Sequence, residues 1–173
     1  ITKNGEKIYT RSVGYSDVEK KRKANEKTKY RIGSITKSFT ATVILQLIDE
    51  GKLSLNTTLD QFYPEVVNAS TITIQQLLNH HSGLFNFTNA EDYTSIHGNK
   101  FSKEDLLRAI HKNGKVFEPG EKGEYSNTNY LLLTFVAEDI EKQDFATLIE
   151  KRILKPLQLK NTKVGEEINP KKN

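Results

Sequence analysis

Apolar residues recur at helical spacing through most of this chain, and this periodicity limits the folds open to it. A long, half-buried helix is predicted from Ser34 to Glu50, ended by Gly51 as a C′ glycine, with one face formed by Ile35, Phe39, Val43, Leu47 and Ile48. Shorter helices are predicted over 71–79, 102–113, 127–142 and 144–154. The helix predicted over 102–113 begins with a capping box of Ser102 and Asp105. The chain after residue 33 is therefore predicted to be mainly helical.

The residues before the long helix carry strand signals instead. Asn4-Gly5 lies between two β-favouring stretches, which is the strongest short signal for a hairpin, and a further strand is predicted over 30–33. Strands followed by helices predict an α+β domain, although two or three strands alone make a marginal sheet. We expect one incomplete domain, with the first sheet strands over 1–33, a mainly helical part over 34–162 and a terminal loop over 163–173. Because a strand begins at once, we expect the natural N-terminus to lie upstream of Ile1.

Composition and charge argue against several classes of function. The net charge of +4 is spread among acidic residues, and the densest basic cluster, 20–29, is interpreted as a solvated turn, so no nucleic-acid partner is predicted. The longest aliphatic runs, such as Val43 to Leu45, are far shorter than the about 20 residues of a membrane span, so none is predicted. The chain has no cysteine, and its four histidines lack i, i+4 spacing, so neither a metal nor another cofactor is predicted.

One candidate catalytic element is Ser34-Ile35-Thr36-Lys37, an S-x-x-K pattern at the predicted start of the long helix. Chance alone would give about one such pair in a chain this rich in lysine, so its position carries the weight. A helix start offers backbone N–H groups and a positive dipole end to an alkoxide-like nucleophile. Lys37, one turn on, could stabilise Ser34 or take its proton if burial lowered the lysine pKa. The plainer alternative is an N-cap serine and a solvated lysine.

A second element is the Pro/Gly loop 119–127, which delivers Tyr125 and Asn127 where another helix is predicted to begin. Two residues apart on extended chain, both side chains can project into one cleft. A phenol is a poor base in water, but a neighbouring lysine ammonium makes its anion accessible. The alternative is that Asn127 caps the helix and Tyr125 packs on the core.

Two further patterns receive plainer interpretations. The run His80-His81-Ser82-Gly83 could suggest a serine–histidine pair, but neighbouring side chains cannot easily point at one another. A glycine-bearing helix exit is therefore favoured. The G-x-S-x-G pattern is absent, so the nucleophile elbow of the α/β-hydrolases is not supported.

Taken together, several ordered motifs resemble the class C-like serine β-lactamase and penicillin-binding protein family, which includes D-Ala-D-Ala carboxypeptidases, class C β-lactamases and related esterases. The resemblance runs from about Gly14 to about Thr162. It is carried by the segments 31–41, 51–55, 72–84, 119–120, 125–127 and 154–162.

The resemblance implies roles for the matched positions. Ser34 would be the acylated nucleophile, Lys37 its activating partner and Tyr125 the second proton-transfer group of a Y-x-N motif. Asn127 would donate a hydrogen bond to the substrate amide or to Lys37. It also implies a helical subdomain over a five-stranded antiparallel sheet, a small-molecule or peptidoglycan-peptide substrate, reaction with β-lactams, a bacterial origin, and a cell-envelope or secreted location.

The chain departs from this pattern in one respect. The family's third motif, Lys or His followed by Thr or Ser and Gly on a late strand, has no counterpart, since Lys163-Val164-Gly165 lacks the hydroxyl residue. We therefore expect the late strands to be missing, the 173 residues alone to be weak or inactive, and a second chain to be able to supply the remaining strands. Two functions stay open: a serine hydrolase acting through an acyl-enzyme, and a non-catalytic relative serving as a binding or assembly module.

Overall fold

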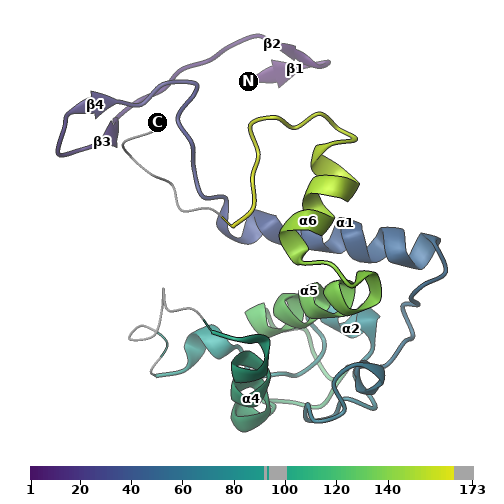
Figure 1. The fold of residues 1–173 in the computed structure, drawn as a ribbon. Coiled ribbons are helices and arrows are strands. Elements are labelled where there is room, and N and C mark those ends of the chain that lie inside the picture. The colour runs from purple at the N-terminus through teal and green to yellow at the C-terminus, as the bar shows by residue number, and fades with distance from the viewer. Residues whose placement is uncertain (92, 94–100, 166–173) are drawn as a thin grey trace. The chain divides into compact units, whose positions relative to one another are not determined.

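A computed structural model describes residues 1–91, 93 and 101–165, which form two compact units (Figure 1). Ile1–Ser34 and Gly165 belong to one unit and Ile35–Val164 to the other. The first unit holds two antiparallel hairpins, β1 (Thr2–Lys3) with β2 (Glu6–Lys7) and β3 (Tyr15–Asp17) with β4 (Arg22–Lys23). The predicted first hairpin is confirmed, since Asn4 and Gly5 have φ of 51° and 82° as a type I′ turn requires.

The strand predicted over 30–33 is wrong. Residues 30–32 belong to no helix or strand, and Gly33 already starts the 3₁₀ turn η1 (Gly33–Ile35). A strand needs a partner to satisfy its backbone groups, and 30–33 pair with no strand in the described part of the chain. The basic stretch predicted to be a solvated turn instead supplies β4, which pairs with β3.

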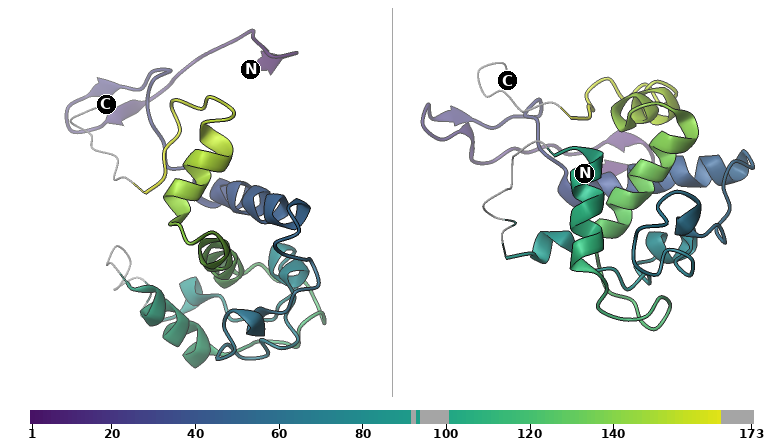
Figure 2. Two further views of the ribbon diagram at one scale, coloured as in Figure 1. Left: turned by 45° about the vertical axis from the view of Figure 1, so that its right-hand side comes forward. Right: turned by 60° about the horizontal axis from the view of Figure 1, so that its bottom comes forward.

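The second unit is helical. Its elements are α1 (Thr36–Asp49), η2 (Leu59–Gln61), α2 (Ile74–Leu78), η3 (Phe87–Asn89), α4 (Lys103–Asn113), α5 (Asn127–Glu141), α6 (Phe145–Ile149) and a π-helical turn, Glu150–Leu154. Figures 1 and 2 both show α5 between α1 and α4, while α1, α2 and α6 all pack against α5. In the described part of the chain no helix is long and apolar enough to cross a membrane.

The predicted helix ends are largely confirmed where local sequence signals encode them. Ser102 and Asp105 form the expected capping box at α4, and Thr73 forms a second one with Gln76 at α2. Helix α1 ends in a Schellman motif, because Lys52 N–H donates to Leu47 O at 2.9 Å and Gly51 lies at φ 70°. The helix starts two residues later than predicted, at Thr36.

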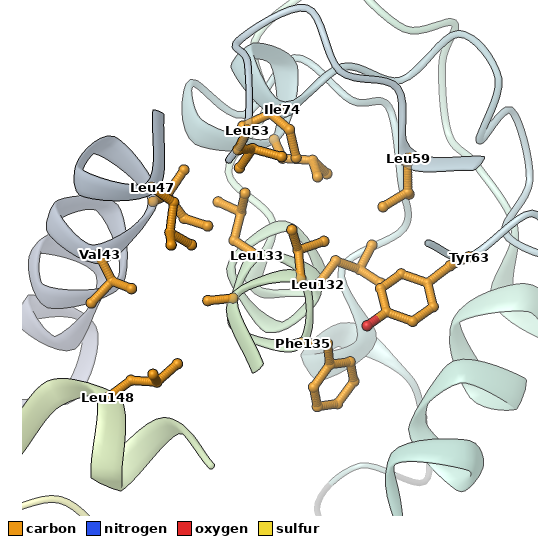
Figure 3. Close-up of a cluster of buried hydrophobic side chains, with 14 of the residues drawn as sticks. Val43, Leu47, Leu53, Leu59, Tyr63, Ile74, Leu132, Leu133, Phe135 and Leu148 are labelled. Atoms are coloured by element: carbon orange, nitrogen blue, oxygen red, sulfur yellow. The ribbon is translucent and has the colours of Figure 1, made fainter. Parts of the chain in front are cut away.

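The buried face of α1 is largely the predicted one, since Val43 and Leu47 are buried and Phe39 and Ile48 are partly buried against the same core. Ile35, expected on the apolar face, is 64% exposed, whereas Ile44 is fully buried. Val43 and Leu47 face the core as predicted, where they meet Leu132 and Leu133 of α5 and Leu148 of α6 (Figure 3). This core fixes α1 against α5, the two helices that carry the candidate site residues of the second unit.

Charged side chains hold the far ends of α1 and α5 together. Arg152 bonds Glu50 through Nη1 at 2.6 Å and pairs with Glu141 through Nη2 at 2.9 Å, and Lys52 donates to Glu141 at 2.7 Å. Hydrogen bonds from Arg152 and then Lys52 lower the pKa of Glu50 to about 2. The relative position of the two helices therefore rests on ion pairs as well as on apolar packing.

The loop between α4 and α5 lies on the segment that follows α2. Val116 N–H donates to Gly83 O, Gly120 N–H to His81 O and Glu124 N–H to His80 O, at 2.8 to 2.9 Å. The approach is closest at Gly83, where a Cβ would lie 2.1 Å from Phe117 O. Gly83 also has φ 75°, so both backbone conformation and space require glycine there.

Replacing Gly83 by alanine is expected to lower the free energy of unfolding by at least about 2 kcal/mol, because the loop must move away in addition to the strain at positive φ. Gly51→Ala is the matched control, since Gly51 has φ 70° with nothing near its would-be Cβ, and it should cost about 1 kcal/mol. Urea unfolding of both variants measures the difference. Equal losses would contradict a steric role for Gly83.

Candidate active site

Three of the four candidate site residues meet where the start of α1 faces the start of α5. Lys37 Nζ donates a hydrogen bond to Asn127 Oδ1 at 2.7 Å, and Tyr125 Oη donates to the same oxygen at 3.2 Å. Lys37 lies in the first turn of α1, and Asn127 is the first residue of α5. The packing of α1 on α5 thus joins residues 90 positions apart in the sequence.

The amide of Asn127 is held in one orientation. Its Oδ1 accepts the two bonds above, while its Nδ2 donates to Thr88 Oγ1 and its backbone N–H donates to Asn86 Oδ1, both at 3.0 Å. The expectation that Asn127 donates to Lys37 is wrong in direction, since an ammonium has no acceptor and the lysine is the donor. The second hydrogen on Nδ2 is the group that could donate to a substrate carbonyl.

Aromatic rings surround the amine of Lys37. Nζ lies 4.8 Å from the centroid of the Tyr125 ring and 5.6 Å from that of Tyr130, both within the range of cation–π contacts. Tyr130 Oη donates to Leu78 O at 3.0 Å, which ties its ring to the end of α2. Tyr125 is 49% exposed, so the alternative that it packs into the core is wrong. Its ring contacts the Lys37 amine, and its hydroxyl donates to the amide oxygen that also holds this amine.

Ser34 is placed in the 3₁₀ turn η1, three residues before Lys37, and belongs to the first unit. It is not the N-cap that the plainer interpretation proposed, because the N-cap of α1 is Ile35, which makes no side-chain cap bond. Asn127 is not an N-cap either, since that position is occupied by Ser126. The structure therefore brings together Lys37, Tyr125 and Asn127, and places Ser34 in the turn that leads into α1.

His80 is a site residue that the sequence interpretation missed. It ends α2 in a second Schellman motif, with His81 N–H donating to Gln76 O at 2.8 Å, so the left-handed residue of this helix exit is His80 at φ 63° and not the predicted glycine. Its ring lies 4.7 Å from that of Tyr125. The available sequence signal was a histidine directly after the helix predicted over 71–79, at a position where a helix exit commonly has glycine.

The described residues include no group of three or more His, Asp or Glu side chains close enough to hold a metal ion. What the cluster can do is move protons. An amine, a phenol and a fixed amide oxygen within hydrogen-bond distance can exchange a proton with a nucleophile presented beside them.

Comparison with known proteins gives a consistent family. The β-lactamase family model matches residues 1–173. Protein flp of Staphylococcus aureus strain MW2 is 40% identical over 167 residues, which cover 94% of this chain and 33% of that protein. The chain thus spans about a third of the length of this relative.

Solved structures show the same fold. D-amino acid amidase from Ochrobactrum anthropi SV3, complexed with L-phenylalanine amide, has a TM-score of 0.82 at 29% identity, covering 92% of this chain and 44% of its own. The octameric penicillin-binding protein homologue from Pyrococcus abyssi has a TM-score of 0.76 at 34% identity, covering 90% and 37%. These findings confirm both the resemblance inferred from the motifs and the β-lactamase-like α+β fold. The chain belongs to the β-lactamase family of serine acyl-transfer hydrolases.

Proposed function

We propose that the whole protein is a serine hydrolase that reacts through an acyl-enzyme at Ser34. The observation that carries this proposal is the shared acceptor, Asn127 Oδ1, which holds the Lys37 amine and the Tyr125 phenol together. A serine, a lysine and a tyrosine in these positions are the groups that acyl transfer without a histidine base requires.

The proposed reaction begins with attack of Ser34 Oγ on a carbonyl carbon. The serine proton passes to the Lys37–Tyr125 pair, one of which must first have lost its own proton, because in the structure both donate to Asn127. The same pair then returns the proton to the leaving nitrogen or oxygen as the bond to carbon breaks. Water attacks the resulting ester, the pair accepts a proton from it, and Ser34 leaves as the alcohol.

The proposed substrate is an amide, a β-lactam or an ester, of the kind that a D-Ala-D-Ala carboxypeptidase or a β-lactamase-related enzyme takes. Two of the similar proteins support this range: one is a D-amino acid amidase and the other a penicillin-binding protein homologue. The three substrate classes share acylation and differ in how fast water removes the acyl group. A penicillin is a direct probe of the first step, because opening of its ring leaves the whole molecule attached to the serine.

The proposal is tested by mapping the adduct. The protein is incubated with a fluorescent penicillin, digested, and the labelled peptide identified by mass spectrometry. We expect a single adduct, equal in mass to the intact penicillin, on the peptide that contains Ser34. Adduct formation at another residue would contradict the assignment of the nucleophile. Absence of any penicillin adduct in the whole protein, together with no turnover of an activated nitrophenyl ester, would favour a binding or assembly module.

A further inference from the structure

The His80 ring lies just after the end of α2, against residues 125 and 126 of the loop that leads into α5. Its Nδ1 lies 3.2 Å from the backbone N–H nitrogen of Ser126 and 3.3 Å from Asn129 Nδ2. The ring stacks against Tyr125 at 4.7 Å and against Tyr130 at 5.2 Å, centroid to centroid. One histidine therefore touches the residue before Asn127 and both of the rings around the Lys37 amine.

A buried chain of donors decides which nitrogen of His80 carries the proton. The Ser82 hydroxyl accepts a hydrogen bond from Leu84 N–H at 3.1 Å and donates its own hydrogen to Asn129 Oδ1 at 2.6 Å. This bond orients the amide of Asn129, which is fully buried, with Nδ2 toward His80. Since Nδ2 and the Ser126 N–H are both donors, Nδ1 of His80 must be an acceptor, and the neutral ring carries its hydrogen on Nε2.

The main chain of His80 adds a second attachment to the same segment. Its carbonyl accepts from Glu124 N–H at 2.9 Å, so bonds to His80 flank Tyr125 on both sides. The left-handed backbone at φ 63°, set by the exit from α2, turns both the ring and the carbonyl toward residues 124–126. Contacts from this one residue thus hold the chain on both sides of Tyr125.

We propose that neutral His80 is a positioning residue for the site: through Nδ1, its carbonyl and its ring, it holds residues 124–126 so that Tyr125 and Asn127 meet Lys37, and its protonation releases them. This inference rests on the proposed function for its effect on the reaction, although the hydrogen bonds that it describes stand by themselves.

Acidification should act through this residue. Burial, then the charge of Lys37, lower the pKa of His80 below its ordinary 6.5. A base with a lowered pKa in the folded protein favours folding above its unfolded pKa, and that contribution is lost as the pH falls through the folded value. Protonation puts a hydrogen on Nδ1, where two donors already point. The titratable groups that face the ring are Lys37, His81, Tyr125 and Tyr130.

The test compares the whole protein with His80→Asn, His80→Ala and His111→Asn. Asparagine tolerates the left-handed backbone, can place its amide oxygen near the position of Nδ1, and does not titrate. At pH 8 we expect His80→Asn to acylate with penicillin within about fivefold of wild type and His80→Ala to be slower by about ten- to a hundredfold, since small misplacements are costly. His111→Asn is the matched histidine control, because the His111 ring lies on α4 and bonds Glu65 O.

The pH profile separates positioning from a merely structural role. The ratio of the wild-type acylation rate to that of His80→Asn should fall as the pH is lowered from 8 to 5, because only wild type has a proton to gain at this position. Any pH dependence that the two proteins share cancels in the ratio. The ratio to His111→Asn should stay constant. A ratio to His80→Asn that is independent of pH would overturn the proposal.

A measurement without the reaction distinguishes failure of this inference from failure of the proposed function. Nitrogen-15 NMR of the histidine rings should show the Nε2-protonated tautomer for His80, and the Ser126 amide signal should shift with the His80 titration. An Nδ1-protonated His80 ring would overturn the positioning role even in an active enzyme. So would a Ser126 amide chemical shift that stays constant while His80 titrates. The expected tautomer in a protein that neither reacts with penicillin nor turns over a nitrophenyl ester would keep the positioning contacts and reject the hydrolase.

Discussion

Labelling by a fluorescent penicillin should fall by at least about 10³-fold when Ser34 is replaced by alanine, because no other group can then form the acyl bond. The rate of adduct formation, followed by intact mass, measures the change. Lys37, Tyr125 and Asn127 belong to the helical unit and keep their mutual contacts in this variant. The loss should therefore come without a change in the midpoint of urea unfolding.

Ser38→Ala is the matched control for this experiment. Ser38 lies four residues further on, in the first turn of α1, and its hydroxyl donates to Ile35 O at 2.6 Å. Its loss removes a serine from the same segment without removing the proposed nucleophile, so labelling should stay within about threefold of wild type. Persistent labelling of Ser34→Ala, or equal losses in the two variants, would reject Ser34 as the acylated residue.

Local signals account for the parts of this fold that could be predicted from the sequence. The Asn4-Gly5 turn, the Ser102 capping box and the glycine after α1 each encode a bond pattern within a few residues, and all three are present. The core periodicity of α5 is equally local. These elements form in the expected places because propensity, capping and burial favour the same structure.

The errors come from features that depend on residues distant in the sequence. Residues 30–33 have strand-like composition, but a strand is defined by a partner, and composition does not name one. Ile35 lies in η1, before α1, and is exposed, whereas Ile44 joins the predicted face, because the elements packed on the helix decide how wide its buried face is. Each error is a tertiary effect on a local preference.

The candidate site likewise has features that local motifs predict and features that they do not. The S-x-x-K and Y-x-N patterns identified Lys37, Tyr125 and Asn127 as a group, and the structure places them in contact. The orientation of the Asn127 amide and of the His80 ring depends on Thr88 and on the Ser82–Asn129 pair, which lie far from these residues in the sequence and belong to no motif. Motifs thus indicate which residues meet, and the surrounding hydrogen bonds decide how each is oriented.

Lys37→Ala and Tyr125→Phe should each slow acylation by at least about a hundredfold, and the double variant should be little slower than the worse single one. The reason is geometric. The Lys37 amine and the Tyr125 phenol share Asn127 Oδ1 as acceptor, and Lys37 Nζ lies 4.8 Å from the centroid of the Tyr125 ring. The proton that leaves Ser34 therefore passes through one lysine–tyrosine unit and not through two separate groups. Tyr130→Phe is the control, because it removes a neighbouring hydroxyl that bonds Leu78 O while keeping the ring, and it should cost less than about tenfold. Penicillin acylation rates of the four proteins in the cycle measure the coupling. Losses that multiply, to at least about 10⁴-fold in the double variant, would show two independent proton paths and contradict a single lysine–tyrosine unit.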